Sequence, residues 1–221
     1  MVVYFFAKVV PVLRTSTGSK FVSFFDDLFN ISPGSQAELY VSRRLKKLDS
    51  RHYFVFNDIM LPSIGNTPYS QIDHLVISRF GIFSLETKSH KGWIFGSKNN
   101  MFWTQCIYGT KYKFYNPLRQ NFAHIKAIES ALLQFRLNSP IHSLVVFPTA
   151  SKIIVNGTNE VGDTSHALEV LLSYKDAVYS ENEYYQIIQL IQAAIITDSH
   201  LRSVHNEQVN ALINSRAHAQ V

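Results

Sequence analysis

Apolar positions along the chain follow two periods, which divide it into predicted helices and predicted strands. Where apolar residues recur every three to four positions, one side of a helix can face a core. This helical spacing covers four stretches, the first of them rich in phenylalanine: 21–29, 35–48, 115–135 and 181–196. Asn116 and Pro117 suit the start of the third, because asparagine caps helix N-termini and proline fits the first helical position.

Strand-like stretches lie between these helices. They are rich in β-branched and aromatic residues and are separated by segments that contain glycine, proline or asparagine. The predicted strands are 53–60, 71–78, 82–89, 92–96, 101–109, 141–149 and 152–157. The order helix, strands, helix, strands, helices predicts an α/β (α+β) fold with a mixed central sheet flanked by helices.

The 221 residues are enough for one large domain with attached helices. We expect three parts, an N-terminal apolar segment with the Phe-rich helix, a core, and a helical C-terminal part packed on that core: 1–33, 34–160 and 161–221. The apolar start is interrupted by Lys8 and Pro11 and is shorter than the ~20 residues that span a bilayer. It also lacks the features of a signal peptide. We therefore expect no stable membrane span and a cytoplasmic protein, with peripheral membrane association as the alternative.

Composition removes several classes of function. Hydrophobic residues make up 46% of the chain and charged residues 17%, so it can bury a core and does not have the composition of a disordered protein. The single cysteine, Cys106, excludes an internal disulfide and a cysteine-rich zinc site, and we interpret it as a packed thiol. The sequence has no phosphate-binding P-loop, zinc-protease motif or glycine-rich dinucleotide loop. The formal charge of +5 permits a polyanionic partner.

Two acids and a lysine lie inside the predicted hairpin "QIDHLVISRFGIFSLETKSHKG" (71–92), where an unpaired buried charge would be costly. Glu86 and Lys88 are two residues apart, so both point to one face of their strand. If a two-residue turn closes the hairpin, Asp73 lies opposite Glu86 on that face. A three-residue turn with a bulge would shift the pairing by one step. Local geometry alone can therefore gather the three charges.

Adjacent carboxylates repel each other, and a hard divalent cation such as Mg²⁺ relieves that repulsion. Asp73 and Glu86 could hold such a cation, and Lys88 could orient a water or offset charge on a phosphoryl transition state. These are the components of phosphodiester hydrolysis. The other interpretation is a solvated, ion-paired sheet surface worth at most ~1 kcal/mol. The cluster alone leaves both interpretations open.

Three stretches together resemble the nuclease-related domain (NERD) family in order, spacing and residue type. They are "SQAELYVSRRLKKL", "IMLPSIGNTPYSQIDHLVISRFGIFSLETKSHKGWIFG" and "FYNPLRQNFAHIKAI", within about residues 34 to 150. Their combined Q-I-D-H, G-I-F, E-T-K and N-P-L-x-Q-N motifs are far more specific than E-x-K alone. The family is assigned to the PD-(D/E)xK, restriction-endonuclease-like superfamily. The resemblance therefore implies that core fold and a nuclease that uses Mg²⁺ or Mn²⁺. Many relatives carry a full transmembrane helix at the N-terminus, from which this chain departs.

The resemblance also implies which residues act. The helix glutamate corresponds to Glu38, the first strand acid to Asp73, and the E-x-K pair to Glu86 and Lys88, with both strand acids as metal ligands. No core position of the motif is lost. Five further positions are candidates for supporting the site or binding nucleic acid, the last helix residues among them as phosphate contacts: Gln71, Asn116, Arg119, Gln120 and Lys126.

Several of these residues also have a structural interpretation. Ser35 and Glu38 form the S-x-x-E pattern of a capping box, which would explain a glutamate at a helix start. His74 should point away from Asp73 and pack or form hydrogen bonds, whereas Gln71 shares the face of the aspartate.

On the predicted helix 115–135, Asn116 is most simply an N-cap. Gln120 and His124 share one side of that helix, which could meet DNA, the sheet or solvent.

Basic residues fit a nucleic-acid partner. One group lies on or after the helix 35–48, and another follows the hairpin. A third interleaves with aromatic residues, which can stack bases while the basic residues hold phosphates. Its members are Lys111, Lys113, Arg119, Tyr108, Tyr112, Phe114 and Tyr115. An ordinary solvated surface explains the same residues, and phosphate contact predicts binding that weakens steeply with salt.

The leading hypothesis is a Mg²⁺-dependent nuclease that acts on DNA, with RNA left open. One alternative is a nucleic-acid-binding or scaffold module that retains the fold without catalysis. Another is a protein-interaction role through the Phe-rich helix 21–29. A homodimer is compatible with all three.

Overall fold

The computed structural model describes residues 32–64 and 67–218. The predicted apolar segment at the start of the chain and the Phe-rich helix 21–29 lie outside these residues. The described residues from Ala37 onward form one compact unit. Its architecture is of the predicted mixed α/β class, but with two mixed sheets instead of the one expected.

The first sheet has five strands. Their order across the sheet is β1 (Tyr53–Pro62), β2 (Tyr69–Ser78), β3 (Gly81–Thr87), β7 (His142–Val146) and β9 (Val161–Gly162). The first three strands pair in antiparallel fashion, and the pairs β3–β7 and β7–β9 are parallel. Strand β3 is buried at all seven positions. Any polar side chain on this strand must therefore find a partner inside the protein.

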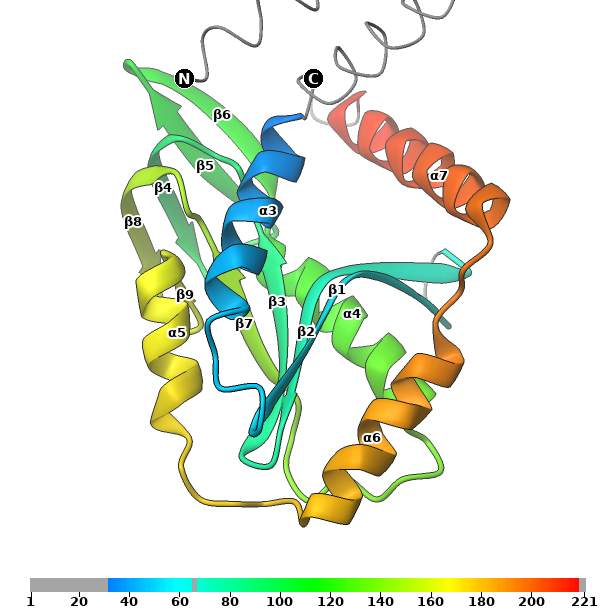
Figure 1. Ribbon diagram of the computed structural model, residues 1–221. Coiled ribbons are helices and arrows are strands. Elements are labelled where there is room, and N and C mark those ends of the chain that lie inside the picture. Colours follow the sequence, from blue (N-terminus) through cyan, green and yellow to red (C-terminus); the bar gives the residue numbers. More distant parts are fainter. Residues whose placement is uncertain (1–31, 65–66, 219–221) are drawn as a thin grey trace, which may run out of the picture. The chain divides into compact units, whose positions relative to one another are not determined.

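Helices pack on both faces of the first sheet (Figure 1). On one face, α4 (Pro117–Ala131) and α6 (Glu181–Ala194) cover Leu75, Ile77 and Ile82. On the other, α3 (Pro33–Leu45) and α5 (Thr164–Ser173) cover Val76 and Phe83. Because strand side chains alternate between faces, residues in step with Leu75 and Ile82 point toward α4.

The second sheet has four strands in the order β6 (Thr110–Tyr115), β5 (Phe102–Ile107), β4 (Gly92–Ser97) and β8 (Ala150–Asn156). One face packs on a small core that includes Ile94, Trp103 and Phe147. A Cβ atom at Gly96 would overlap the Trp103 indole, so glycine is needed for this close approach. Strand β6 was not predicted, although its sequence alternates in the manner of a strand.

The helix starts differ in how well they were predicted. Asn116 caps α4 as expected, since its Oδ1 accepts a hydrogen bond from the Leu118 amide at 2.9 Å. The capping box of Ser35 and Glu38 is wrong: α3 begins at Pro33, and the Ser32 hydroxyl accepts from the Ser35 amide at 3.2 Å. A glutamate at position 38 therefore has no capping role.

The last helix, α7 (Ser199–His218), is joined to the first sheet by Arg202, which contacts Asp58 of β1 through its guanidinium nitrogens at 2.9–3.0 Å. No helix within the described ranges is both long and apolar enough to cross a bilayer.

Candidate active site

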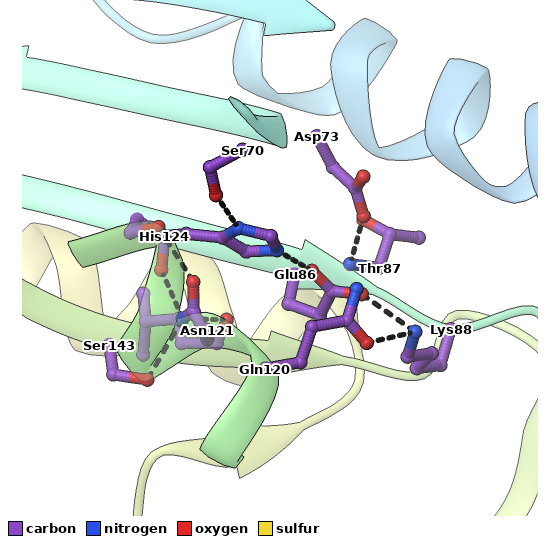
Figure 2. A network of polar contacts seen from close by, with 11 residues as sticks. Ser70, Asp73, Glu86, Thr87, Lys88, Gln120, Asn121, His124 and Ser143 are labelled. Atoms are coloured by element: carbon purple, nitrogen blue, oxygen red, sulfur yellow. Dashed lines mark hydrogen bonds and ion pairs between the residues drawn. The ribbon is translucent and has the colours of Figure 1, made fainter. Parts of the chain in front are cut away.

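The hairpin of β2 and β3 has the predicted two-residue turn, with Ser78 paired to Gly81 and His74 to Leu85. One further step in this register brings Asp73 beside Glu86. Asp73 is fixed there by the Thr87 amide, which donates to its Oδ2 at 2.7 Å. Glu86 is in step with the strand residues that face α4, and His124 of that helix contacts it, so this part of the cluster lies between the sheet and α4 (Figure 2).

Glu86 is the most deeply buried member of the cluster, with a side chain only 2% exposed. The Lys88 ammonium donates to Oε1 at 2.7 Å, and His124 Nε2 lies 3.0 Å from Oε2. Burial opposes ionisation of this carboxyl, but Lys88 and His124 outweigh it and lower its pKa to about 2. Glu86 is therefore an ionised acceptor with both oxygens occupied.

Lys88 is held between two side chains and keeps 21% of its surface exposed. Its Nζ donates to Glu86 and also to Gln120 Oε1 at 2.8 Å. Burial alone would lower the pKa of Lys88, but the neighbouring Glu86 carboxylate raises it. The side chain is thus a charged donor, and it is suited to holding an anionic oxygen or a water rather than to removing a proton.

Asp73 has the opposite electrostatic environment. Burial and the nearby Glu86 raise its pKa well above the ordinary value, and the hydrogen bond from Thr87 only partly opposes this. Within the described ranges Oδ1 accepts no hydrogen bond. A carboxylate that is costly to ionise beside a second carboxylate is a position that a cation stabilises.

Glu38 of α3 belongs to the same electrostatic cluster. The side chain is half-buried, and its pKa is raised by burial and by the charges of Asp58 and Glu86. Asp73 is in turn affected by the charge of Glu38. The structure therefore brings together all four residues that the family resemblance implied as catalytic.

The described residues contain no group of three or more His, Cys, Asp or Glu side chains arranged as a metal site. Two carboxylates completed by waters form a smaller ligand set, which is the usual one for Mg²⁺. Asp73 and Glu86 fit that smaller set.

Helix α4 supplies hydrogen-bond partners for Glu86 and Lys88. The sequence had left open whether this side of the helix meets DNA, the sheet or solvent. Gln120 and His124 point to the sheet, where they contact Lys88 and Glu86 (Figure 2). His124 Nδ1 lies 2.7 Å from the Ser70 hydroxyl. Because the carboxylate can only accept, His124 donates from Nε2, and Nδ1 of the neutral ring then accepts from the Ser70 hydroxyl. The sequence signals for these contacts were the helical spacing of Gln120 and His124 and, for Gln120, its place in the family motif.

Asn121 was not named as a site residue, although it is the last residue of the N-P-L-x-Q-N motif. Its amide accepts from the Ser84 hydroxyl at 2.6 Å and donates to the Ser84 carbonyl and the Ser143 hydroxyl, both at 2.9 Å. These bonds join α4 to β3 and β7. They hold the helix at the depth at which Gln120 and His124 reach the charged cluster.

Gln71 does not join the cluster, although it shares the strand face of Asp73. Its amide donates to Asp58 Oδ1 at 2.7 Å, and Arg202 binds the same carboxylate. Asp58 has a positive φ of 49°, an unusual backbone for a non-glycine residue inside a strand. His74 behaves as expected: it is buried, and its Nδ1 contacts Asn57 Oδ1 at 2.8 Å.

The other candidates on α4 lie outside the cluster. Asn116 is buried and donates to the carbonyls of Lys98 and Asn100 in addition to capping the helix. Arg119 is exposed and contacts a backbone carbonyl at 3.3 Å. Lys126 is exposed and pairs with Glu129 at 2.7 Å. Asn116 has a structural role, and the other two remain available only as surface contacts.

Comparisons with known proteins show which family the chain resembles. The family model described as "Nuclease-related domain" matches residues 33–148. An uncharacterized protein of Bacillus anthracis is 34% identical over 186 residues, which cover 79% of this chain and 84% of the relative. No solved structure matches.

Proposed function

The chain belongs to the nuclease-related domain family, and from this premise we propose that it is a metal-dependent nuclease that hydrolyses phosphodiester bonds in DNA. The observation that supports this most is the buried Glu86–Lys88 ion pair of 2.7 Å beside a second carboxylate, Asp73. A structural ion pair needs one acid and one base. Two further acids, Asp73 and Glu38, lie in the same cluster, and burial and neighbouring carboxylates raise the pKa of both.

Asp73 and Glu86 are the residues that would hold the metal, Mg²⁺ or Mn²⁺. A bound divalent cation supplies a Lewis acid for the phosphate oxygens and a more acidic water. The raised pKa of Asp73 supports the assignment, because its carboxylate is ionised at a cost that a cation would remove.

The other residues have roles that follow from their contacts. Lys88 is a fixed ammonium donor that would orient the attacking water or stabilise negative charge on the phosphoryl group. Gln120 accepts a hydrogen bond from the Lys88 ammonium and so helps to fix its position. His124 orients Glu86, and Glu38 adds negative charge at the edge of the cluster. In the reaction a water oxygen forms a bond to phosphorus as the bond to the leaving oxygen breaks.

A binding module without catalysis is favoured by one specific observation. Both oxygens of Glu86 are already occupied, by Lys88 and His124. A carboxylate satisfied in this way does not require a cation for stability. The interaction role assigned to the helix 21–29 depends on residues outside the described part of the chain.

The test is cleavage of labelled linear, circular and single-stranded DNA, with RNA as a further arm, in Mg²⁺, Mn²⁺ or EDTA. Wild type is compared with Lys88→Met, and Lys126→Met is the matched control because Lys126 forms an exposed ion pair of the same 2.7 Å length. We expect metal-dependent cleavage by wild type and the control and loss in Lys88→Met. Binding without cleavage under every metal would contradict the proposal.

A further inference from the structure

The second sheet has an outer face that differs from its core face. Residues on the core face, such as Ile94, Trp103 and Phe114, pack in one cluster. Residues that alternate with them point the other way. On this outer face the side chains are mainly aromatic or basic: Trp93, Phe95, Phe102, Tyr115, Lys111, Lys113 and Lys152.

Strand pairing arranges these residues in rows. One row crosses all four strands in the order Lys152, Trp93, Cys106 and Lys111. The next row runs Ile154, Phe95, Thr104 and Lys113. Each row thus carries an aromatic ring on β4 and a lysine at the β6 edge, and the first has a second lysine at the β8 edge.

The rings and the lysines are accessible. Trp93 is 48% exposed, whereas Trp103 on the core face is 1% exposed. Lys152 Nζ lies 4.8 Å from the centre of the Trp93 ring, and Trp93 also contacts Phe95 at 6.1 Å between ring centres. The three lysines are exposed. A solvent-facing tryptophan next to ammonium groups is costly to leave open and suits a flat, anionic ligand.

Among charged side chains, the segment that contains β4, β5 and β6 carries only positive ones. Residues 87–128 contain no aspartate or glutamate, but seven basic residues: Lys88, Lys91, Lys98, Lys111, Lys113, Arg119 and Lys126. None of the residues in the rows described above is acidic. The charged side chains in these rows are therefore all positive, which attracts polyanions.

We propose that this outer face binds single-stranded nucleic acid, with bases stacked on Trp93 and Phe95 and phosphates held by Lys111, Lys113 and Lys152. Only unpaired bases present their flat faces to aromatic side chains, which favours a single strand over a duplex. The site lies on a different sheet from the acidic cluster, and it goes beyond the proposed nuclease because binding here requires no cleavage.

The structure changes which aromatic residues take part. The sequence grouped Tyr108, Tyr112 and Phe114 with the lysines of β6. Phe114 instead packs in the core, and Tyr112 alternates with the lysines onto the opposite side. Tyr108 follows the end of β5 at the tip of the hairpin, with a positive φ of 49°. The rings beside the lysines come from β4 and β5, which precede them in the chain.

Binding is measured by fluorescence anisotropy with a labelled oligothymidine and with a duplex of equal length, in EDTA so that no cleavage occurs. We expect tighter binding of the single strand. A triple variant, Lys111→Gln with Lys113→Gln and Lys152→Gln, should weaken it at least tenfold and reduce the slope of log Kd against log salt by about two, since each phosphate contact on a single strand contributes ~0.7. The matched control removes three exposed lysines elsewhere: Lys46→Gln, Lys47→Gln and Lys175→Gln.

Stacking is tested separately from charge. Trp93→Ala should weaken binding about tenfold, because a base–aromatic stack is worth ~1–3 kcal/mol, and Trp93→Phe should recover part of the loss. The only cysteine, Cys106, lies between Trp93 and Lys111 in the first row and serves as a probe. Saturating oligothymidine should slow its alkylation.

Several results would overturn the proposal: equal losses in the triple variant and its control, tighter binding of the duplex, or alkylation of Cys106 that oligothymidine does not slow. A Cys106 that resists alkylation in the free protein, together with no oligonucleotide binding, would also overturn the proposal, because the face would then not be accessible. Because the measurement is made in EDTA, its outcome is independent of cleavage. If the proposed nuclease activity is not found, the proposal of a single-strand binding face is still tested by this measurement.

Discussion

The five-stranded sheet holds its charged cluster at buried positions against α4, whereas the four-stranded sheet carries its lysines on an outer face. In the first sheet Asp73, Glu86 and Lys88 each have a polar partner within 3.0 Å. Burial raises the pKa of Asp73, whereas Lys88 and His124 outweigh burial at Glu86 and lower its pKa. In the second, Lys152 lies over the exposed Trp93 ring, and Lys111 and Lys113 are exposed on the β6 edge. The buried acids of the first sheet therefore have shifted pKa values, which suits them for catalysis. The exposed lysines of the second sheet can attract an anionic ligand.

The largest expected effect contrasts the two faces of the second sheet. Trp103→Ala should lower the free energy of unfolding by about 3–5 kcal/mol, because the side chain is 1% exposed and its removal leaves a cavity. Trp93→Ala on the outer face should change it by less than about 0.5 kcal/mol. Urea unfolding of both variants measures the difference. Equal losses would show that Trp93 is a packing residue and not an open stacking surface.

The next effect contrasts buried and exposed ion pairs. Lys88→Met should destabilise the protein by about 3 kcal/mol, since it leaves the Glu86 charge buried with His124 alone. Lys126→Met breaks a pair of the same 2.7 Å length on the surface and should cost less than about 1 kcal/mol. Chemical denaturation compares the two. Adding Glu86→Gln to Lys88→Met should restore part of the loss, and a further loss of similar size would contradict this account.

A smaller loss of stability is expected when uncharged hydrogen bonds are removed instead of an ion pair. Asn121→Ala should cost about 1–3 kcal/mol, because it leaves the buried groups of Ser84 and Ser143 without their partner. We also expect slower cleavage, as α4 would no longer hold Gln120 and His124 in place. Thermal unfolding and the cleavage assay measure these two consequences. Unchanged stability would mean that water replaces the asparagine.

The smallest effect concerns pH. Burial lowers the pKa of His74 to about 4, and its Nε2 is buried without a partner in the described part of the chain. His74 therefore binds a proton more tightly in the unfolded chain than in the folded protein. The contribution of neutral His74 to the free energy of unfolding is fully present above about pH 6.5 and is lost as pH falls. Between pH 6.5 and 5.5 we expect a loss of about 1 kcal/mol. We measure the free energy of unfolding by urea titration at several pH values. The His74→Gln variant should not show this loss between pH 6.5 and 5.5. A His74 resonance that titrates near pH 6.5 by NMR would refute it.

The sequence predicted what short-range geometry determines. Asp73, Glu86 and Lys88 come together because a two-residue turn fixes the register of one hairpin. Asn116 was correctly placed as a cap, since capping involves only the next few residues. The resemblance to known relatives supplied Glu38, whose position near the cluster depends on how α3 packs.

What could not be predicted depends on contacts between distant segments. His124 and Glu86 are 38 residues apart, and no local pattern relates them. Gln71 was predicted to support the site, but its amide donates to Asp58, whose carboxylate also binds Arg202, 144 residues further along the chain. Strand β6 was missed for a different reason. Its alternation was visible, but the lysines and tyrosines were interpreted only as a binding surface.

The most direct test of the central claim, that the cluster on the first sheet performs the chemistry, is the single-turnover rate of DNA cleavage in Mg²⁺ at saturating enzyme. Glu86→Gln removes a charge from the cluster, and Glu129→Gln removes one from the surface pair on α4. We predict a rate at least ~100-fold lower for Glu86→Gln, with DNA affinity retained, and a wild-type rate for Glu129→Gln. Cleavage by Glu86→Gln at the wild-type rate would contradict the account.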